Sequence, residues 1–471
     1  MNIKSSLIAC VSLAALLPIN AIAQTITDED LGALIKRINQ LEQEVRSLRS
    51  ELDSVGSKQV GSKQVGSKQV GLAQKEQKQD QNKGVIVIKD DSDDEPSVSF
   101  NWKGAPEIKG DGGWSVKPKG RVLYDFNNLS SVPSSLDIPG EGLSSEARRL
   151  RFGIQGTMPG SFGYKLIADY LDGVKLTDAY FTYEDGPLTL TLGQHNTFQG
   201  LEELSSSNDT SFVERAAYTD AFGFERRVGL SATYKLNDFQ LEGGVFTDNI
   251  DDLDDGNNSF SVDGRVSYTT VVDDTFIHLG SSVHVRDLGN EIDSIRYRQR
   301  PFVHSVNTRF INTDDISGAT DELSYGLEAA AIAGRFHVVA ETHWAHVARS
   351  EFADPTFFGG SIEAGYYLTQ DTREYKGGVF KGVKVNDPVS NGGTGAWQIN
   401  FRFDRLDLVD AGIVGGAQDA YMASLIWTPV NEVRFLFNYA HLSYTDALNI
   451  VEGAPNDFSV NVIGLRGQLG F

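Results

Sequence analysis

Alternation of apolar and polar residues, sustained from about Trp114 to the last residue, is the feature that most constrains the fold of this chain. A period of two places successive side chains on opposite faces of a β-strand, one face apolar and the other polar. In the last such segment the alternation starts at Ile463 and runs to Phe471, and a terminal aromatic residue resembles the assembly signal of outer-membrane barrels. Short turns separate some segments and long polar stretches separate others, as in a barrel inserted into a membrane from one side.

The number of strands follows from the side on which the chain ends lie. Both ends of such a barrel are expected in the periplasm, so the strand number must be even. Assigning Pro301 to Phe310 to an outer loop gives an all-β transmembrane barrel of about 16 antiparallel strands, the size of porins with an aqueous lumen. This assignment leaves residues 371–395 as an unusually long periplasmic connection, and the sequence assigns them no role.

The faces of individual strands can be predicted from the same alternation. Between positions 397 and 404 every second side chain is expected to face lipid and the others the lumen. The residues expected to face lipid are Trp397, Ile399, Phe401 and Phe403, and those expected to face inward are Gln398, Asn400, Arg402 and Asp404.

One polar segment between two alternating strands is unusually long. It runs from Gln194 to Phe224 and is rich in Ser, Asn, Asp and Glu. Connections of this length between neighbouring strands are usually functional or disordered. We therefore expect it to be a loop that folds into the barrel and narrows the pore.

The first 23 residues read as a secretory signal peptide. Lys4 supplies the positive end, residues 7–19 the apolar stretch, and Ala21-Ile22-Ala23 a small-x-small cleavage site. The only cysteine of the chain, Cys10, lies within this segment, so disulfides and thiol chemistry are not expected in the mature protein.

Residues 24–55 carry a heptad repeat of apolar residues. It begins at Leu31 and ends at Val55, which predicts an α-helical coiled coil. β-Branched Ile38 and Val45 at one seam position favour a parallel dimer. A trimeric barrel would override that preference, and we expect a homotrimer. Residues 56–113 form a flexible spacer with three GSKQV repeats and an acidic linker.

Composition and motifs exclude several functions. A formal net charge of −22 makes nucleic acid an unsuitable partner. Neither a G-x-S-x-G nucleophile motif nor a phosphate-binding G-x-x-x-x-G-K loop is present, and we expect no enzyme and no cofactor. Motifs alone leave an outer-membrane lipase open, because its serine and histidine would lie apart in the sequence. His337, Glu341 and His343 share one strand face. Along a strand His337 and Glu341 are too far apart to coordinate one metal ion without a partner strand, so we expect no metal and interpret all three as polar lumen residues.

Several arginines fall on the polar faces of predicted strands and should point into the lumen. Fixed cations there attract anions. The alternative is that they pair with inward carboxylates and stiffen the wall, and the sequence leaves both interpretations open. The arginines are Arg149, Arg151, Arg227, Arg265, Arg286 and Arg402, and the possible partners are Asp263, Glu242, Asp169 and Asp404.

Taken in order, these motifs resemble the phosphate-selective porin O and P family along nearly the whole chain. The resemblance rests on the coiled coil after the signal peptide and on a series of short motifs in the barrel. These are Arg148-Arg149-Leu150-Arg151-Phe152-Gly153, Tyr164-Lys165, Asp178-Ala179-Tyr180 with Tyr183, Gly200-Leu201-Glu202, Glu214-Arg215, Arg226-Arg227-Val228-Gly229 and Arg300-Pro301.

The resemblance implies a trimer of sixteen-stranded barrels in the outer membrane of a Gram-negative bacterium, with the third loop folded inward and anions carried on basic side chains. The coiled coil would lie in the periplasm and lipid would surround the barrel. The sequence departs from the family in that loop, where phosphate-binding relatives tend to carry lysine. Here those positions hold Glu203 and either Asn208 or Asp209, whereas Arg215 is retained.

We therefore expect a porin for small anionic solutes such as phosphate or polyphosphate, with only moderate anion preference. The alternatives are a structural outer-membrane anchor and a non-selective or cation-permeable porin. The candidate anion-binding residues are Arg149, Arg151, Arg215, Arg226 and Arg227, and the acids expected to oppose them at the constriction are Glu202, Glu203, Asp209 and Glu214.

Overall fold

The computed structural model describes residues 86–88, 98–102, 104–136, 141–254, 256–447 and 455–471. The expected signal peptide, coiled coil and GSKQV repeats lie outside these ranges. In the ranges that the structure does describe, no helix has the length and hydropathy to cross a membrane.

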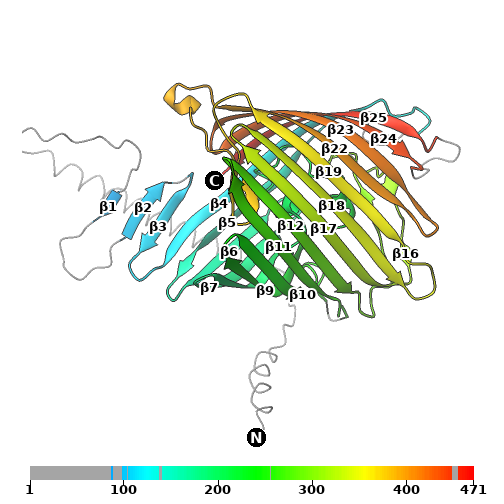
Figure 1. The fold of residues 1–471 in the computed structure, drawn as a ribbon, viewed down its shortest axis with the longest axis horizontal. Helices are drawn as coiled ribbons and strands as arrows, with labels where there is room; N and C mark the ends of the chain where they lie inside the picture. The colour runs from blue at the N-terminus through cyan, green and yellow to red at the C-terminus, as the bar shows by residue number, and fades with distance from the viewer. Residues whose placement is uncertain (1–85, 89–97, 103, 137–140, 255, 448–454) are drawn as a thin grey trace, which may run out of the picture. The chain divides into compact units, whose positions relative to one another are not determined.

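The described residues form a closed, antiparallel barrel of sixteen strands (Figure 1), which confirms the predicted fold class. Closure is made by pairing the last strand with the first, from Asn461 opposite Ser130 to Gly470 opposite Arg121. The strands are β4 (Ser115–Ser130), β5 (Gly142–Met158), β6 (Phe162–Asp169), β7 (Lys175–Asp185), β8 (Leu188–Asn196), β9 (Arg226–Leu236), β10 (Phe239–Phe246), β11 (Phe260–Val272), β12 (Thr275–Asp287), β17 (Ala319–Ala333), β18 (Phe336–Arg349), β19 (Thr356–Tyr367), β22 (Ala396–Asp410), β23 (Ile413–Val430), β24 (Val433–Thr445) and β25 (Phe458–Gly470).

The two ends of the barrel differ in their connections. Short turns such as Gly186–Pro187 and Asn237–Asp238 lie at one end, the periplasmic end in outer-membrane barrels. Longer loops lie at the other end. The segment Pro301–Phe310 falls in the outer connection 288–318, as expected, together with four two-residue strands. These are β13 (Ser294–Ile295), β14 (Arg298–Gln299), β15 (Ile311–Asn312) and β16 (Ile316–Ser317).

The predicted inward and outward faces are confirmed on β22. Phe401 is 61% exposed on the outside of the barrel, whereas Asn400 and Asp404 are fully buried in its interior. Alternation therefore identified the lipid-facing side chains of this strand correctly.

The third outer loop, residues 197–225, folds into the barrel interior. It contains two short helices, α2 (Leu201–Leu204) and α3 (Ala217–Ala221). Its Phe212 and Tyr218 are completely buried in an apolar cluster with inward side chains of the far strands, among them Phe357, Leu406 and Leu442. Burial of this much apolar surface holds the loop against the wall.

The long periplasmic connection, residues 368–395, also folds inward. It contains β20 (Glu374–Lys376), β21 (Val379–Lys381) and a 3₁₀ turn at Val389–Asn391. Val379 and Phe380 pack against Leu201 of the third outer loop. The lumen is thus occupied from both ends by segments that meet inside it.

Three further strands continue the sheet beyond the periplasmic end. They are β1 (Ile86–Ile88), β2 (Val98–Trp102) and β3 (Pro106–Gly110). β3 pairs with the first residues of β4, Ile108 lying opposite Val116.

Candidate functional site

The third outer loop is fastened to the far wall by carboxylates that accept backbone N–H groups. Glu341 of β18 accepts the N–H groups of Leu201 and Glu202, both at 2.8 Å. Gly200 allows this approach, because its φ is +80° and a Cβ there would lie 2.9 Å from Glu341 Oε2. Asp404 of β22 accepts the N–H of Ala217 at 3.0 Å in the same way. These contacts fix the starts of both short helices.

Arg215 acts within the loop itself. Its guanidinium donates to the backbone carbonyls of Glu202, Glu203 and Ser205 at 3.0, 3.2 and 2.7 Å, and lies 3.3 Å from the Glu203 carboxylate. It therefore satisfies the carbonyls at the end of α2 and is neutralised by Glu203.

Glu214 is held by two arginines of the barrel wall. Arg148 donates to it through Nε and Nη2 at 3.0 and 3.2 Å, and Arg466 through Nη2 at 3.2 Å. Burial alone would raise the pKa of Glu214, but the two guanidinium groups outweigh that effect and hold its pKa well below the usual range. Glu214 is consequently ionised and compensated.

Two arginines converge on a single hydroxyl at the loop tip. Arg121 of β4 and Arg149 of β5 both donate to Ser207 Oγ, at 2.6 and 2.8 Å. Neither has a carboxylate within ion-pairing distance in the part of the chain that the structure describes, and the buried Nε of Arg149 has no partner at all. A neutral hydroxyl cannot balance two positive charges, so this position would be stabilised by an anion.

The other predicted lumen arginines are ion-paired. Arg151 lies 2.8 Å from Asp169, and Arg226 shares Asp178 with Lys165, each at 3.4 Å. On the strands, Arg265 pairs with Glu242 and Glu328, Arg286 with Asp248 and Glu322, and Arg402 with Glu202 and Glu363. Asp169 and Glu242 are among the possible partner acids that the sequence had suggested.

Arg227 occupies a different place from the other candidates. It pairs with Asp248 and with Glu225, and lines a separate pocket between the third loop and the strands β12 and β17. Its charge is therefore neutralised away from the side chains that surround Ser207.

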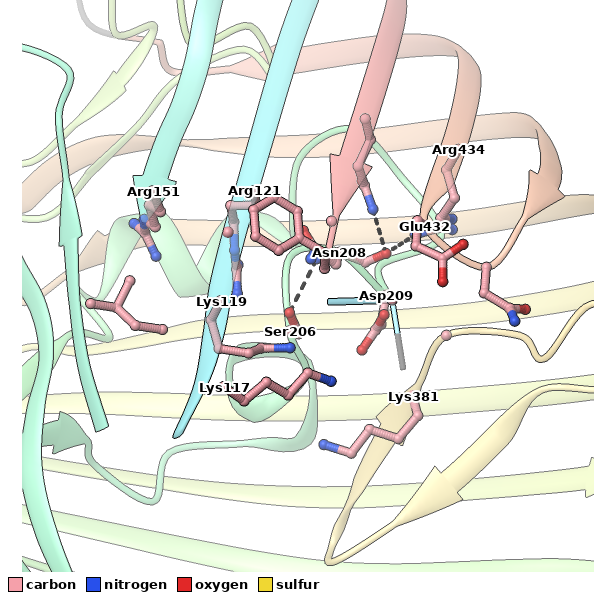
Figure 2. Close-up of a pocket in the computed structure, with 18 of the residues that line it drawn as sticks. Lys117, Lys119, Arg121, Arg151, Ser206, Asn208, Asp209, Lys381, Glu432 and Arg434 are labelled. Carbon is pink, nitrogen blue, oxygen red and sulfur yellow. Dashed lines mark hydrogen bonds between the residues drawn. The ribbon is translucent and has the colours of Figure 1, made fainter. Parts of the chain in front are cut away.

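A cavity of about 440 Å³ lies beside Ser206 (Figure 2), and its lining includes Glu432 and Phe471 at the periplasmic end. We call it the inner cavity. Among the described residues its lining has seven basic side chains and two acidic ones, which leaves a clear excess of positive charge. The basic residues are Lys117, Lys119, Arg121, Arg151, Lys165, Lys381 and Arg434, and the acidic residues are Asp209 and Glu432.

A second cavity, of about 480 Å³, lies toward the outer loops, and we call it the outer cavity. Arg121 lines the inner cavity, Arg149 the outer cavity and Arg151 both, so these three arginines, which we call the arginine cluster, lie where the two cavities meet. The outer cavity is also lined by Arg148, Arg215, Arg226 and Arg300, but eight carboxylates balance its basic side chains. Positive charge therefore dominates only from the arginine cluster inward.

Asp209 opposes the basic side chains of the inner cavity. It is partly buried, its backbone carbonyl accepts from Arg373 at 3.0 Å, and its carboxylate faces the space that Lys119 and Lys381 also enter (Figure 2). Burial raises the pKa of Asp209, although Arg434 and Lys381 act in the opposite direction.

Two histidines of β18 contact the segments that fold into the lumen. His343 stacks on Tyr218 with ring centroids 4.7 Å apart, and His337 lies 3.2 Å from Arg373. The described residues contain no group of three His, Cys, Asp or Glu side chains arranged to hold a metal ion.

Sequence reasoning missed several basic residues of the inner cavity. Lys117, Lys119 and Arg121 alternate with Pro118 and Gly120, so period two could have placed them on the lumen face. Lys381 carried no such signal, because only the inward fold of the periplasmic connection brings it to the cavity.

Comparison with known proteins settles the family. The sequence model of the phosphate-selective porin O and P family matches residues 116–471, which include all the barrel strands but for the first residue of β4. The chain belongs to the phosphate-selective porin O and P family. It is therefore an outer-membrane porin, a channel protein built as a barrel.

Individual relatives agree with this membership. Porin O of Pseudomonas aeruginosa is 26% identical over 361 residues, which are 68% of this porin and 79% of that protein. A protein of Caulobacter vibrioides is 44% identical over 385 residues, which are 79% of this porin and 77% of that protein. The solved structure of OprB from Pseudomonas putida, 10% identical, matches with a TM-score of 0.50 over 77% of this porin and 95% of that chain, and supports the fold alone.

Proposed function

We propose that this porin conducts small anionic solutes, inorganic phosphate among them, along the wall formed by β4, β5 and β6. The observation that carries the proposal is the convergence on Ser207 of Arg121 and Arg149, neither of which has a carboxylate partner among the described residues. The excess of basic side chains in the inner cavity extends the same charge toward the periplasm.

The proposed path would be narrow. The third outer loop and the periplasmic connection fill the far side of the lumen, where most arginines are paired with carboxylates. In a narrow, poorly hydrated passage a fixed charge is screened much less than on an open surface. A few unpaired cations can then outweigh the net charge of −22 of the whole chain. The balanced charges of the outer cavity favour moderate selectivity over tight binding.

Inhibition of chloride current by inorganic phosphate in planar bilayers tests this function. Phosphate on one side of the wild-type channel should reduce the chloride current. Loss of a charge-assisted hydrogen bond costs about 1.5–3 kcal/mol, so Arg121→Ala and Arg149→Ala should each need roughly tenfold more phosphate for the same inhibition.

Arg286→Ala is the matched control, because this lumen arginine has two carboxylate partners and lines neither the inner nor the outer cavity. It should respond to phosphate like the wild type. The proposed site would be refuted if phosphate did not reduce the chloride current of the wild type, or if it reduced the current equally in all three variants.

We also propose that the porin is a homotrimer whose residues before the barrel lie in the periplasm. The direction of β4 supports the second part, since it enters the barrel from the end with short turns. The predicted heptads of residues 24–55 would then bring the three chains together below the membrane. Protease added to intact cells should leave that segment uncut.

A further inference from the structure

The sheet formed by β2 and β3 has one apolar and one polar face. Cross-strand partners lie on the same face, and Phe100 is opposite Ile108, which is itself opposite Val116 of β4. Lys117 lines the inner cavity, so Val116, one residue before it, points outward. Phe100, Ile108 and Val116 therefore share the outer, lipid-facing side of the barrel wall.

Two tryptophans extend this face. Trp102 lies two residues after Phe100 and is 72% exposed. Trp114 precedes β4 and covers Gly110, since a Cβ there would lie 2.3 Å from its ring. On the opposite side Ser99 pairs with Lys109 and Asn101 with Glu107. The barrel's alternation of apolar outside and polar inside thus continues beyond the barrel.

The sheet lies at the level where the barrel leaves the membrane. The turn between β2 and β3 meets the β23–β24 turn, because a Cβ at Gly104 would lie 3.1 Å from Glu432 Oε1. Near that turn Trp427 stacks between Trp397 and Phe435, and its ring centroid is 5.6 Å from each of theirs. Aromatic residues of this kind mark the membrane–water interface of outer-membrane barrels.

We propose that the apolar face of β2, β3 and Trp114 is an interfacial anchor that lies in the headgroup region of the periplasmic leaflet. Lipid is the occupant that the structure favours, because β2 and β3 continue the sheet of the barrel and this face continues its lipid-facing side. Tryptophan is the side chain best suited to this depth, since its ring is apolar and its N–H can reach water or headgroups. The anchor would fix the point at which the chain passes from the barrel to its periplasmic segment.

Spin labels at single cysteines test the anchor. Cys10 is the only cysteine of the chain, so Phe100→Cys and Trp102→Cys in a Cys10→Ser background each carry one label. Asn101→Cys, on the polar face of the same strand, is the matched control. The full chain is reconstituted in phospholipid vesicles, and folding is checked by the heat-dependent shift in gel mobility.

Labels at positions 100 and 102 should collide more with oxygen, which concentrates in lipid, than with a water-soluble nickel chelate. At position 101 the label should collide more with the nickel chelate than with oxygen. Equal access of the chelate at all three positions would place the face in water and overturn the anchor. Protection from both reagents, with dipolar broadening between labels, would mean that a second copy of the chain covers the face instead of lipid.

Discussion

Arg121 and Arg149, on neighbouring strands, donate to the same oxygen atom, the hydroxyl of Ser207. Like charges so close repel each other unless an anion lies between them, and a hydroxyl supplies only a partial negative charge. Most other arginines of the lumen have that repulsion removed by carboxylates. Among the positions along the passage, a solute anion is therefore stabilised most strongly beside this pair of arginines.

The anchoring of the third outer loop predicts how the channel responds to loss of Glu341. Glu341→Ala removes the acceptor of two backbone N–H groups, and leaving a buried N–H group without a partner costs about 1–3 kcal/mol. We expect α2 to detach from β18 and single-channel conductance to increase, with larger current fluctuations.

Asp263→Ala provides the control for that measurement. Asp263 is also buried in the lumen, but it contacts Ser261 of its own strand and His284 of β12 instead of the loop. Its loss should leave conductance close to the wild-type value. If Glu341→Ala also conducts like the wild type, the carboxylate does not hold the loop.

Asp209 predicts a pH dependence of selectivity. Its pKa is raised by burial, so it takes up a proton at a higher pH than an ordinary aspartate, whose pKa is about 3.9. Acidification then removes the acid that faces Lys119 and Lys381, and anion preference should rise. The raised pKa also means that the folded protein binds the proton more tightly, so this group's contribution to stability decreases as pH rises through that window.

Reversal potentials measured from neutral to acidic pH check this prediction. Asp209→Asn should show the higher anion preference already at neutral pH and lose the part of the acid response that Asp209 causes. An acid response that is unchanged in Asp209→Asn would assign it to another group.

The periplasmic connection predicts a second determinant of conductance. Tyr375 of β20 hydrogen-bonds His278 at 2.7 Å, and Arg265 donates to the carbonyl of Gly378 at 2.8 Å, so the hairpin is tied to β11 and β12. Replacing residues 374–381 with a short Gly-Ser link should widen the inner cavity and raise conductance. Tyr375→Phe, which keeps the ring packing, should have a smaller effect. Unchanged conductance in the link variant would place the hairpin outside the ion path.

The oligomeric state can be tested on the purified, detergent-solubilised porin. Chemical cross-linking should give trimers as the largest product. A variant without residues 24–55 should show how far the predicted heptads contribute to that assembly. Only monomers and dimers from the full chain would contradict the proposed trimer.

Local periodicity was sufficient to predict much of this fold. Alternation placed Phe401 outside and Asp404 inside, the even strand number assigned Pro301–Phe310 to an outer loop, and the length of one polar segment identified the third loop. Each of these inferences depends on neighbours in sequence, whose geometry in a strand is fixed.

The charge pairing of the lumen could not be predicted in the same way. Arg466 reaches Glu214 from a strand 252 residues away, and Lys381 enters the cavity only because the periplasmic connection folds inward. Arg215, a candidate anion-binding residue, donates to backbone carbonyls of its own loop. Such contacts depend on the path of two loops across the lumen, which no local pattern encodes.

The reversal potential of the wild-type channel in a potassium chloride gradient tests the central claim most directly. If Arg121, Arg149 and the basic side chains of the inner cavity govern passage, chloride will be the more permeant ion. The potential will then have the sign of an anion-selective channel despite the net charge of −22. A potential that shows potassium to be more permeant than chloride would contradict the account and leave a cation-permeable porin.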